Sequence, residues 1–141
     1  MANVIPYSFR GELLTGTHNF ASGGDSFKFA LYTASPYSTA STAYSATNEV
    51  SASGTGYTTT GNTLSGNAVA YGTAVASCDF DDTAWTTATF TAAFGAIYND
   101  SQSDKLCVVL DFSGNKTCSN GTFTISFPSP STAADAIISM A

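Results

Sequence analysis

The sequence predicts an all-β fold, a single β-sandwich or jelly-roll-like domain over residues 1–141 with a short N-terminal helix. Three observations predict it. Short segments with alternating apolar and polar residues recur along the chain, and turn signals separate them about every 8–12 residues. Aromatic residues make up 13% of the 141 positions, enough apolar material for a core. No internal repeat and no linker divides the chain.

Residues 5–15 have the pattern of a short amphipathic helix. Three apolar residues recur four positions apart and share one face: Ile5, Phe9 and Leu13. Pro6 suits the first helical position, and Gly16 suits the position after the last turn. Because so short a helix is marginal alone, we expect it to pack on a sheet or on another subunit.

The first half of the chain then predicts strands and one long loop. Residues 26–32 alternate with a period of two, which indicates a half-buried strand. Residues 34–48 are rich in Ser, Thr and Tyr without periodicity, and we interpret them as a loop. Residues 64–79 predict one or two weak strands. Residues 85–98 predict a longer strand whose phase shifts at residues 92–95, which indicates a bulge.

The second half predicts the remaining strands. Residues 105–112 are apolar on both faces and predict a central strand, whereas residues 113–121 have the turn composition of a hairpin tip. Residues 122–127 alternate cleanly, and residues 137–138 predict a last edge strand. Eight aromatic residues are expected in the core: Phe27, Phe29, Tyr57, Trp85, Phe90, Phe112, Phe123 and Phe127.

Charge is scarce in this chain and excludes several functions. Charged residues make up 10% of positions and the net charge is −6. The four basic residues are scattered, which argues against binding to nucleic acid. The sequence contains neither an apolar run long enough for a membrane span nor the pattern of a secretory signal, so we expect synthesis in a cytoplasm. Chains with so little surface charge often bury much of their surface in neighbours.

No group of residues predicts an active site, a metal site or a cofactor site. His18 is the one histidine and is expected to be a solvated loop residue. The acidic cluster at residues 79–82 lacks the spacing of a calcium loop and is expected to set up a turn. Glu12 and Glu49, the only glutamates, do not form the carboxylate pair of a glycosidase. We therefore expect no enzyme activity and no cofactor.

The three cysteines, Cys78, Cys107 and Cys118, lack metal-ligand spacing. We expect buried free thiols. A bridge between Cys107 and Cys118 across a hairpin is the alternative, which a cytoplasmic origin disfavours.

Tyrosines and loop residues are the candidate contact residues. Tyrosines in the loop at residues 34–48 could stack on sugars, or could pack within the domain or against neighbours, which is the interpretation we favour. The predicted hairpin tip at residues 113–121 is a second candidate patch, because rigid sandwiches present binding residues on end loops. The candidate interface residues are Tyr37, Tyr44, Asn115 and Lys116.

An ordered series of motifs resembles a family of small virion proteins of tailed bacteriophages. A short helix ending in Leu-Leu-x-Gly precedes the strand Asp-Ser-Phe-Lys-Phe-Ala-Leu-Tyr-Thr at residues 25–33. The segments that follow are Thr-Asn-Glu-Val…Gly-x-Gly-Tyr at residues 47–57, Phe-Asp-Asp-Thr-Ala-Trp at 80–85, Ala-Ile-Tyr-Asn at 96–99, and a closing hairpin. The resemblance covers residues 7–127; the insertion at 34–46, the cysteines and the tail after Pro128 depart from it.

The resemblance implies a structural component of a virion, without enzyme activity and without a catalytic residue to transfer. We expect a capsid decoration (cement) protein that binds the major capsid protein or other virion proteins, as a homo-oligomer and by analogy a trimer. The alternative is a tail or fibre component that recognises host glycans through loop tyrosines.

Overall fold

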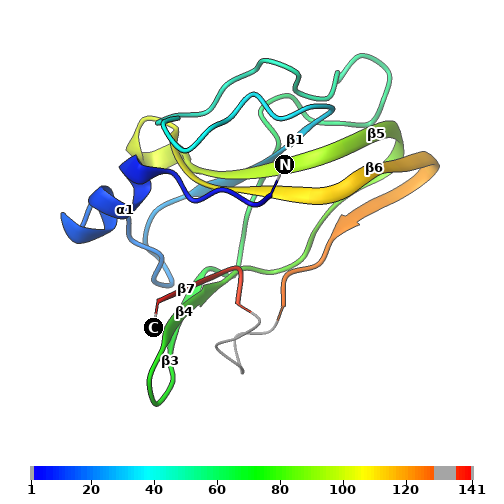
Figure 1. Ribbon diagram of the computed structural model, residues 1–141. Coiled ribbons are helices and arrows are strands. Elements are labelled where there is room, and N and C mark those ends of the chain that lie inside the picture. Colours follow the sequence, from blue (N-terminus) through cyan, green and yellow to red (C-terminus); the bar gives the residue numbers. More distant parts are fainter. Residues whose placement is uncertain (1, 129–135, 141) are drawn as a thin grey trace.

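The computed structural model describes residues 2–128 and 136–140, which form a short helix and two antiparallel sheets (Figure 1). The larger sheet has the order β2-β1-β5-β6 and consists of β2 (Asn62–Thr63), β1 (Phe27–Tyr32), β5 (Thr83–Asn99) and β6 (Lys105–Ile125). The smaller sheet has the order β3-β4-β7 and consists of β3 (Ala68–Tyr71), β4 (Ala76–Asp79) and β7 (Ile138–Met140). The predicted all-β sandwich-like class with a short N-terminal helix is confirmed.

The helix α1 (Tyr7–Leu14) lies within the predicted range and follows Pro6 in extended conformation. Phe9 is buried, and Leu13 packs at the edge of the same core. Leu14 and Ile5 keep 85% and 39% of their surface exposed. One side of the helix is therefore anchored in the core, while the apolar residues next to it remain on the surface.

Strand β1 is buried on both faces, so the expectation of a half-buried strand was wrong. Phe27 and Phe29 point into the main core, as predicted, and so does Leu31. Ala30 and Tyr32 point the other way and are also fully buried. The long loop between β1 and β2 lies over this second face (Figure 1), which removes it from solvent.

Strands β5 and β6 form one long hairpin that supplies most of the larger sheet. The chain reverses through a 3-10 turn, Asp100–Gln102, and through Ser103 and Asp104, which both have φ of 57°. Pairing then continues from Asn99 opposite Lys105 to the far ends of both strands. The predicted hairpin tip at residues 113–121 was therefore wrong, because these residues belong to β6.

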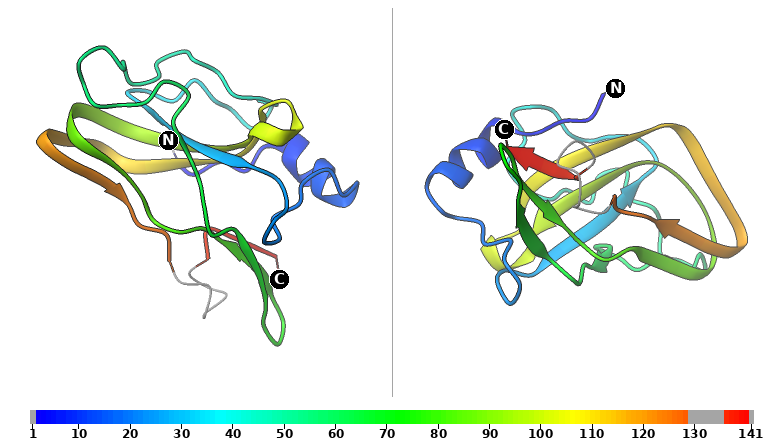
Figure 2. Two further views of the ribbon diagram at one scale, coloured as in Figure 1. Left: turned by 180° about the vertical axis from the view of Figure 1, so that it is seen from behind. Right: turned by 90° about the horizontal axis from the view of Figure 1, so that it is seen from below.

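The turn signal at residues 113–121 produces a bulge instead of a hairpin tip. Phe94 pairs with Asp111 and Ala92 pairs with Lys116, so four residues of β6 stand opposite one residue of β5. Ser113 and Gly114 inside the bulge have φ of 56° and 114°, which explains the turn-like composition. At this bulge the hairpin bends and its outer half folds back beneath the inner half (Figures 1 and 2).

The bend lets one hairpin contribute to both layers of the domain, and the main core lies between them. All eight predicted aromatic residues belong to this core; six are buried, and Phe112 and Phe123 are partly buried at its margin. The sequence interpretation omitted three further aromatics, Phe9, Phe20 and Phe80. Gly95 leaves room for this packing, since a Cβ there would lie 2.4 Å from the ring of Phe29.

Two predictions about strand position had different outcomes. Residues 106–109 of β6 are buried on both faces, as expected, but β6 is the last strand of its sheet and is not central. Its outer edge is covered by isolated bridges from Val4 to Val109 and from Ala43 to Lys105. The weak strands expected in residues 64–79 are β3 and β4, and β7 is the predicted last edge strand.

Candidate functional site

The loop tyrosines form a hydrogen-bonded cluster inside the protein. Tyr37 is 5% exposed, and its hydroxyl lies 2.7 Å from the hydroxyl of Tyr32. It also accepts a hydrogen bond from the Ser45 backbone N–H at 3.0 Å. The ring of Tyr44 packs on Tyr98 with centroids 4.8 Å apart. Tyr37 therefore cannot be the surface contact that the sequence suggested, and Tyr44 is half-buried.

Glu49 holds this cluster to the main core. Its Oε2 accepts a hydrogen bond from Tyr44 at 2.6 Å, and its Oε1 accepts one from Tyr57 at 2.8 Å. The Tyr57 hydroxyl in turn accepts the backbone N–H of Leu31 in β1 at 3.0 Å. One carboxylate thus joins Tyr44 to Tyr57 within the long loop, and Tyr57 joins the loop to β1.

Burial and the nearby carboxylate keep these hydroxyls protonated. Burial is the largest effect that raises the pKa of Tyr44 and Tyr57, and their hydrogen bonds to Glu49 act in the same direction. Each hydroxyl therefore remains a hydrogen-bond donor, and neither is activated as a nucleophile or base. The cluster is a structural support for the loop.

A second buried polar network ties α1 to the β5–β6 turn. His18 Nε2 lies 2.8 Å from Glu12 Oε2, and Lys105 Nζ donates to Glu12 Oε1 at 2.7 Å. On the other side of the ring, His18 Nδ1 lies 2.9 Å from Asn99 Nδ2, which also donates to Asp25 Oδ2 at 2.8 Å. Because an amide nitrogen only donates, Nδ1 is the acceptor, and Nε2–H donates to Glu12.

The expectation that His18 is solvated was therefore wrong, since its side chain has no exposed surface. The His18–Glu12 pair has the geometry of a catalytic dyad, yet the buried imidazole cannot reach a substrate. Its ring packs on Phe9 and Phe20 at centroid distances of 5.1 and 6.1 Å. The arrangement joins α1 to the β5–β6 turn.

The two carboxylates of this network are held in their charged form. Burial, the largest single effect on Glu12, opposes the charge, but hydrogen bonds from Lys105 and His18 outweigh it and lower the pKa of Glu12. Burial of Asp25 is likewise outweighed by hydrogen bonds from the Asn19 backbone and the Asn99 side chain, so its pKa is also lowered.

The acidic cluster and the cysteines have structural positions. Asp82 accepts the backbone N–H of Phe127 at 2.8 Å, a contact between distant segments and not the local turn that the sequence suggested. Within residues 2–128 and 136–140, no group of three or more His, Cys, Asp or Glu could hold a metal ion. All three cysteines are free, which agrees with the expected free thiols and not with the alternative Cys107–Cys118 bridge; Cys78 and Cys107 are buried, and Cys118 is half-buried.

The other two candidate interface residues lie at the bulge. Asn115 and Lys116 are exposed, as an interface would need. The bend that carries them lies at the end of the protein remote from α1 (Figure 1). Because Tyr37 is buried, the four candidate residues do not form one exposed patch.

A different surface stands out, and the sequence interpretation missed it. Six large apolar side chains are exposed in the described part of the chain, and they belong either to α1 and the segment before it or to the smaller sheet: Ile5, Tyr7, Leu14, Val69, Tyr71 and Met140. The register of the smaller sheet explains half of this set. Tyr71, Ala76 and Met140 stand side by side across the three strands, and so do Val69, Cys78 and Ile138. Directly opposed residues point to the same face, so this sheet has one apolar face.

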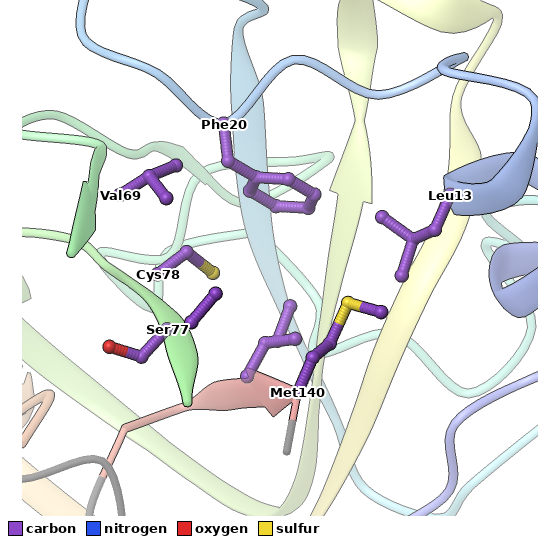
Figure 3. Close-up of a pocket in the computed structure, with 8 residues that line it drawn as sticks. Leu13, Phe20, Val69, Ser77, Cys78 and Met140 are labelled. Carbon is purple, nitrogen blue, oxygen red and sulfur yellow. The ribbon is translucent and has the colours of Figure 1, made fainter. Parts of the chain in front are cut away.

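The apolar face of the smaller sheet and the helix enclose a groove, which we call the α1–β7 groove (Figure 3). It comprises two adjoining pockets of about 160 and 290 Å³ that share Leu13, Ile138 and Met140. Leu13 from α1 and Met140 from β7 point toward one another across it. The first pocket extends to Phe20 and Val69, and the second extends along α1 to Ile5, Arg10 and Leu14.

Among the helices of the described residues, none is both long and apolar enough to cross a membrane. Comparisons with protein-family models, with curated proteins and with solved structures give no match to this chain.

Proposed function

We propose that this chain is a structural protein of a tailed-bacteriophage virion, and within the virion a capsid decoration (cement) protein. It is made in the host cytoplasm, assembles as a homo-oligomer, by analogy a trimer, and binds the shell formed by the major capsid protein. In this role it has no enzyme activity and needs no cofactor. The ordered motifs from residue 7 to residue 127 support the virion assignment.

The observation that carries the proposal is the gathering of exposed apolar side chains around the α1–β7 groove. Monomeric proteins rarely keep such a patch unless another protein covers it. The tyrosine cluster hydrogen-bonds the long loop to the larger sheet, and the His18 network hydrogen-bonds α1 to the β5–β6 turn, so both elements are held in place behind this surface. A rigid domain with one apolar surface suits a protein that clamps neighbouring shell subunits.

The glycan-binding alternative has less support. It needs exposed loop tyrosines, whereas Tyr37 is buried and the Tyr44 hydroxyl is bonded to Glu49. A tail position without glycan binding remains compatible with the apolar surface.

Imaging of intact particles tests the proposal directly. Labelled protein should lie on the capsid, and purified protein added to stripped capsids should bind and raise the temperature at which they open. Label found on the tail alone would exclude the decoration role and keep the structural one. Binding of the purified protein to host cells, with none to capsids, would support the glycan-recognition alternative.

A further inference from the structure

The α1–β7 groove carries its own charge pattern. Arg10 is the one charged residue that lines either of its two pockets. The guanidinium donates to the Ile5 carbonyl at 3.1 Å and lies 5.3 Å from the ring centroid of Tyr7. Lys28 and Lys105 have carboxylate partners at 3.3 and 2.7 Å, but within the described residues Arg10 has none. An exposed cation beside an apolar groove, in a chain of net charge −6, is complementary to a carboxylate.

The size of the apolar surface fits a protein partner. Four of the six exposed side chains line the groove, namely Ile5, Leu14, Val69 and Met140, and their exposed fractions add up to about 2.2 whole side chains. At about 150–200 Å² for a large apolar side chain, they offer roughly 320–430 Å². A standard protein–protein interface buries about 800 Å² on each partner. The groove therefore supplies about half of one side of a specific interface, as an extended segment would need.

The groove is suited to an extended segment. Among the described strands, β7 pairs only with β4, so its outer edge has no strand beside it. An extended peptide can pair with such an edge and place alternate side chains in adjoining pockets. The apolar residues at Leu13, Ile138 and Met140 stand between the two pockets and would contact such side chains on both sides.

We infer that the α1–β7 groove binds an extended apolar segment of a different protein chain, with a carboxylate of that segment next to Arg10. The inference rests on the proposed function, since it assigns the surface that meets the capsid shell. A second copy docked through the same face would bring the two Arg10 side chains toward each other, which like charge opposes. A sugar would find few hydrogen-bonding groups in a groove lined almost entirely by apolar side chains.

The experiment compares four variants for binding to stripped capsids. Leu14→Lys should weaken binding by about tenfold or more, because Leu14 is 85% exposed and can be changed without disturbing the core. Arg10→Gln should weaken binding and reduce its dependence on salt, and Arg10→Lys should restore much of both. Thr122→Lys, an exposed position on β6, is the matched control and should bind as the wild type does.

A second measurement separates this inference from the proposed function. An acetylated and C-terminally amidated Val-Ile-Val-Ile-Val-Asp peptide is titrated into labelled protein and followed by NMR, with the same peptide carrying Lys in place of Asp as control. Shifts at Leu13, Arg10 and Met140 for the Asp peptide alone support the groove even if capsids are not bound. Capsid binding that Leu14→Lys leaves unchanged overturns the inference and leaves the proposed function standing. A dimer that Leu14→Lys dissolves overturns it in favour of a second copy.

Discussion

The hydroxyl of Tyr57 is a sharp test of how the long loop is held. Tyr57→Phe keeps the ring, which is stacked near Trp85 at 5.6 Å, and removes only the oxygen. That oxygen donates to Glu49 at 2.8 Å and accepts the Leu31 backbone N–H at 3.0 Å. The change therefore opens no large cavity and removes two hydrogen bonds at once.

The expected loss follows from these two bonds. A buried donor left without an acceptor costs about 1–3 kcal/mol, and a hydrogen bond to a charged group contributes about 1.5–3 kcal/mol. The two effects share one oxygen and do not add fully, so we expect the free energy of unfolding to fall by about 2–4 kcal/mol. For a chain of this length the melting temperature should fall by roughly 6–15 °C.

Urea unfolding followed by tryptophan fluorescence measures the effect. The matched control is Tyr71→Phe, which removes a hydroxyl from a side chain that is 85% exposed and should change stability by less than about 0.5 kcal/mol. If Tyr57→Phe proves no more destabilising than Tyr71→Phe, the hydroxyl does not hold the loop, and the role assigned to Glu49 is wrong.

Three further predictions follow from the backbone, the carboxylates and the thiols. Gly61→Ala should destabilise the protein strongly, because Gly61 has φ of 81° and a Cβ there would lie 2.0 Å from a backbone oxygen of β1. Gly11→Ala meets no atom and should stabilise α1 by about 0.5–1 kcal/mol. Thermal unfolding of the two variants and the wild type tests both expectations. The lowered pKa values of Glu12 and Asp25 stabilise the folded state above the ordinary carboxyl pKa of about 4, and this contribution should vanish as the pH falls through the folded values. The difference between the urea midpoints at pH 7 and pH 3 should therefore be smaller in Glu12→Gln than in the wild type. The same difference in both proteins would contradict the role given to Glu12 in the network. Cys118, half-buried on β6, should react with a thiol reagent before the buried Cys78 and Cys107. Burial and the adjacent Asp79 also raise the pKa of Cys78 to about 12. Equal reaction rates at the three cysteines would contradict this difference in burial.

Local sequence patterns located an element correctly where its apolar residues recur with the period of a helix or of a strand. The four-residue spacing from Ile5 to Leu13 located α1, and the alternation at residues 27–32 located β1. The same alternation could not show that the second face of β1 is covered, because its cover is a loop without periodicity. Burial by a distant loop leaves no local signal.

Turn composition was misleading at residues 113–121 for a related reason. Gly114 with Ser113 and Asn115 satisfies the same backbone requirement in a bulge as in a hairpin tip. Only the register with β5, set far away at the Asp100–Gln102 turn, distinguishes the two. His18 was misassigned similarly, since its partners Glu12 and Asn99 meet only in three dimensions.

The apolar groove was also beyond the sequence interpretation. The weak strands predicted at residues 64–79 include Val69 and Tyr71, but the exposure of these two side chains depends on what lies opposite them. Strand β3 is joined to β7 through β4, and α1 lies beside this sheet only in the folded chain. The isolated pattern gave no indication that these apolar residues share one surface.

The bent β5–β6 hairpin has a consequence for the route by which the chain folds. Most of the pairing in the larger sheet joins residues that are neighbours in one continuous stretch, 83–125, so it needs no distant loop closure. Strand β1 pairs with β5, so we expect it and the loop after it to dock on a hairpin that has already formed. We therefore expect substitutions at the β5–β6 turn to slow folding, and Tyr57→Phe to leave the folding rate nearly unchanged and to accelerate unfolding. The part of the protein that fixes how long the native state survives would then be different from the part that starts its formation.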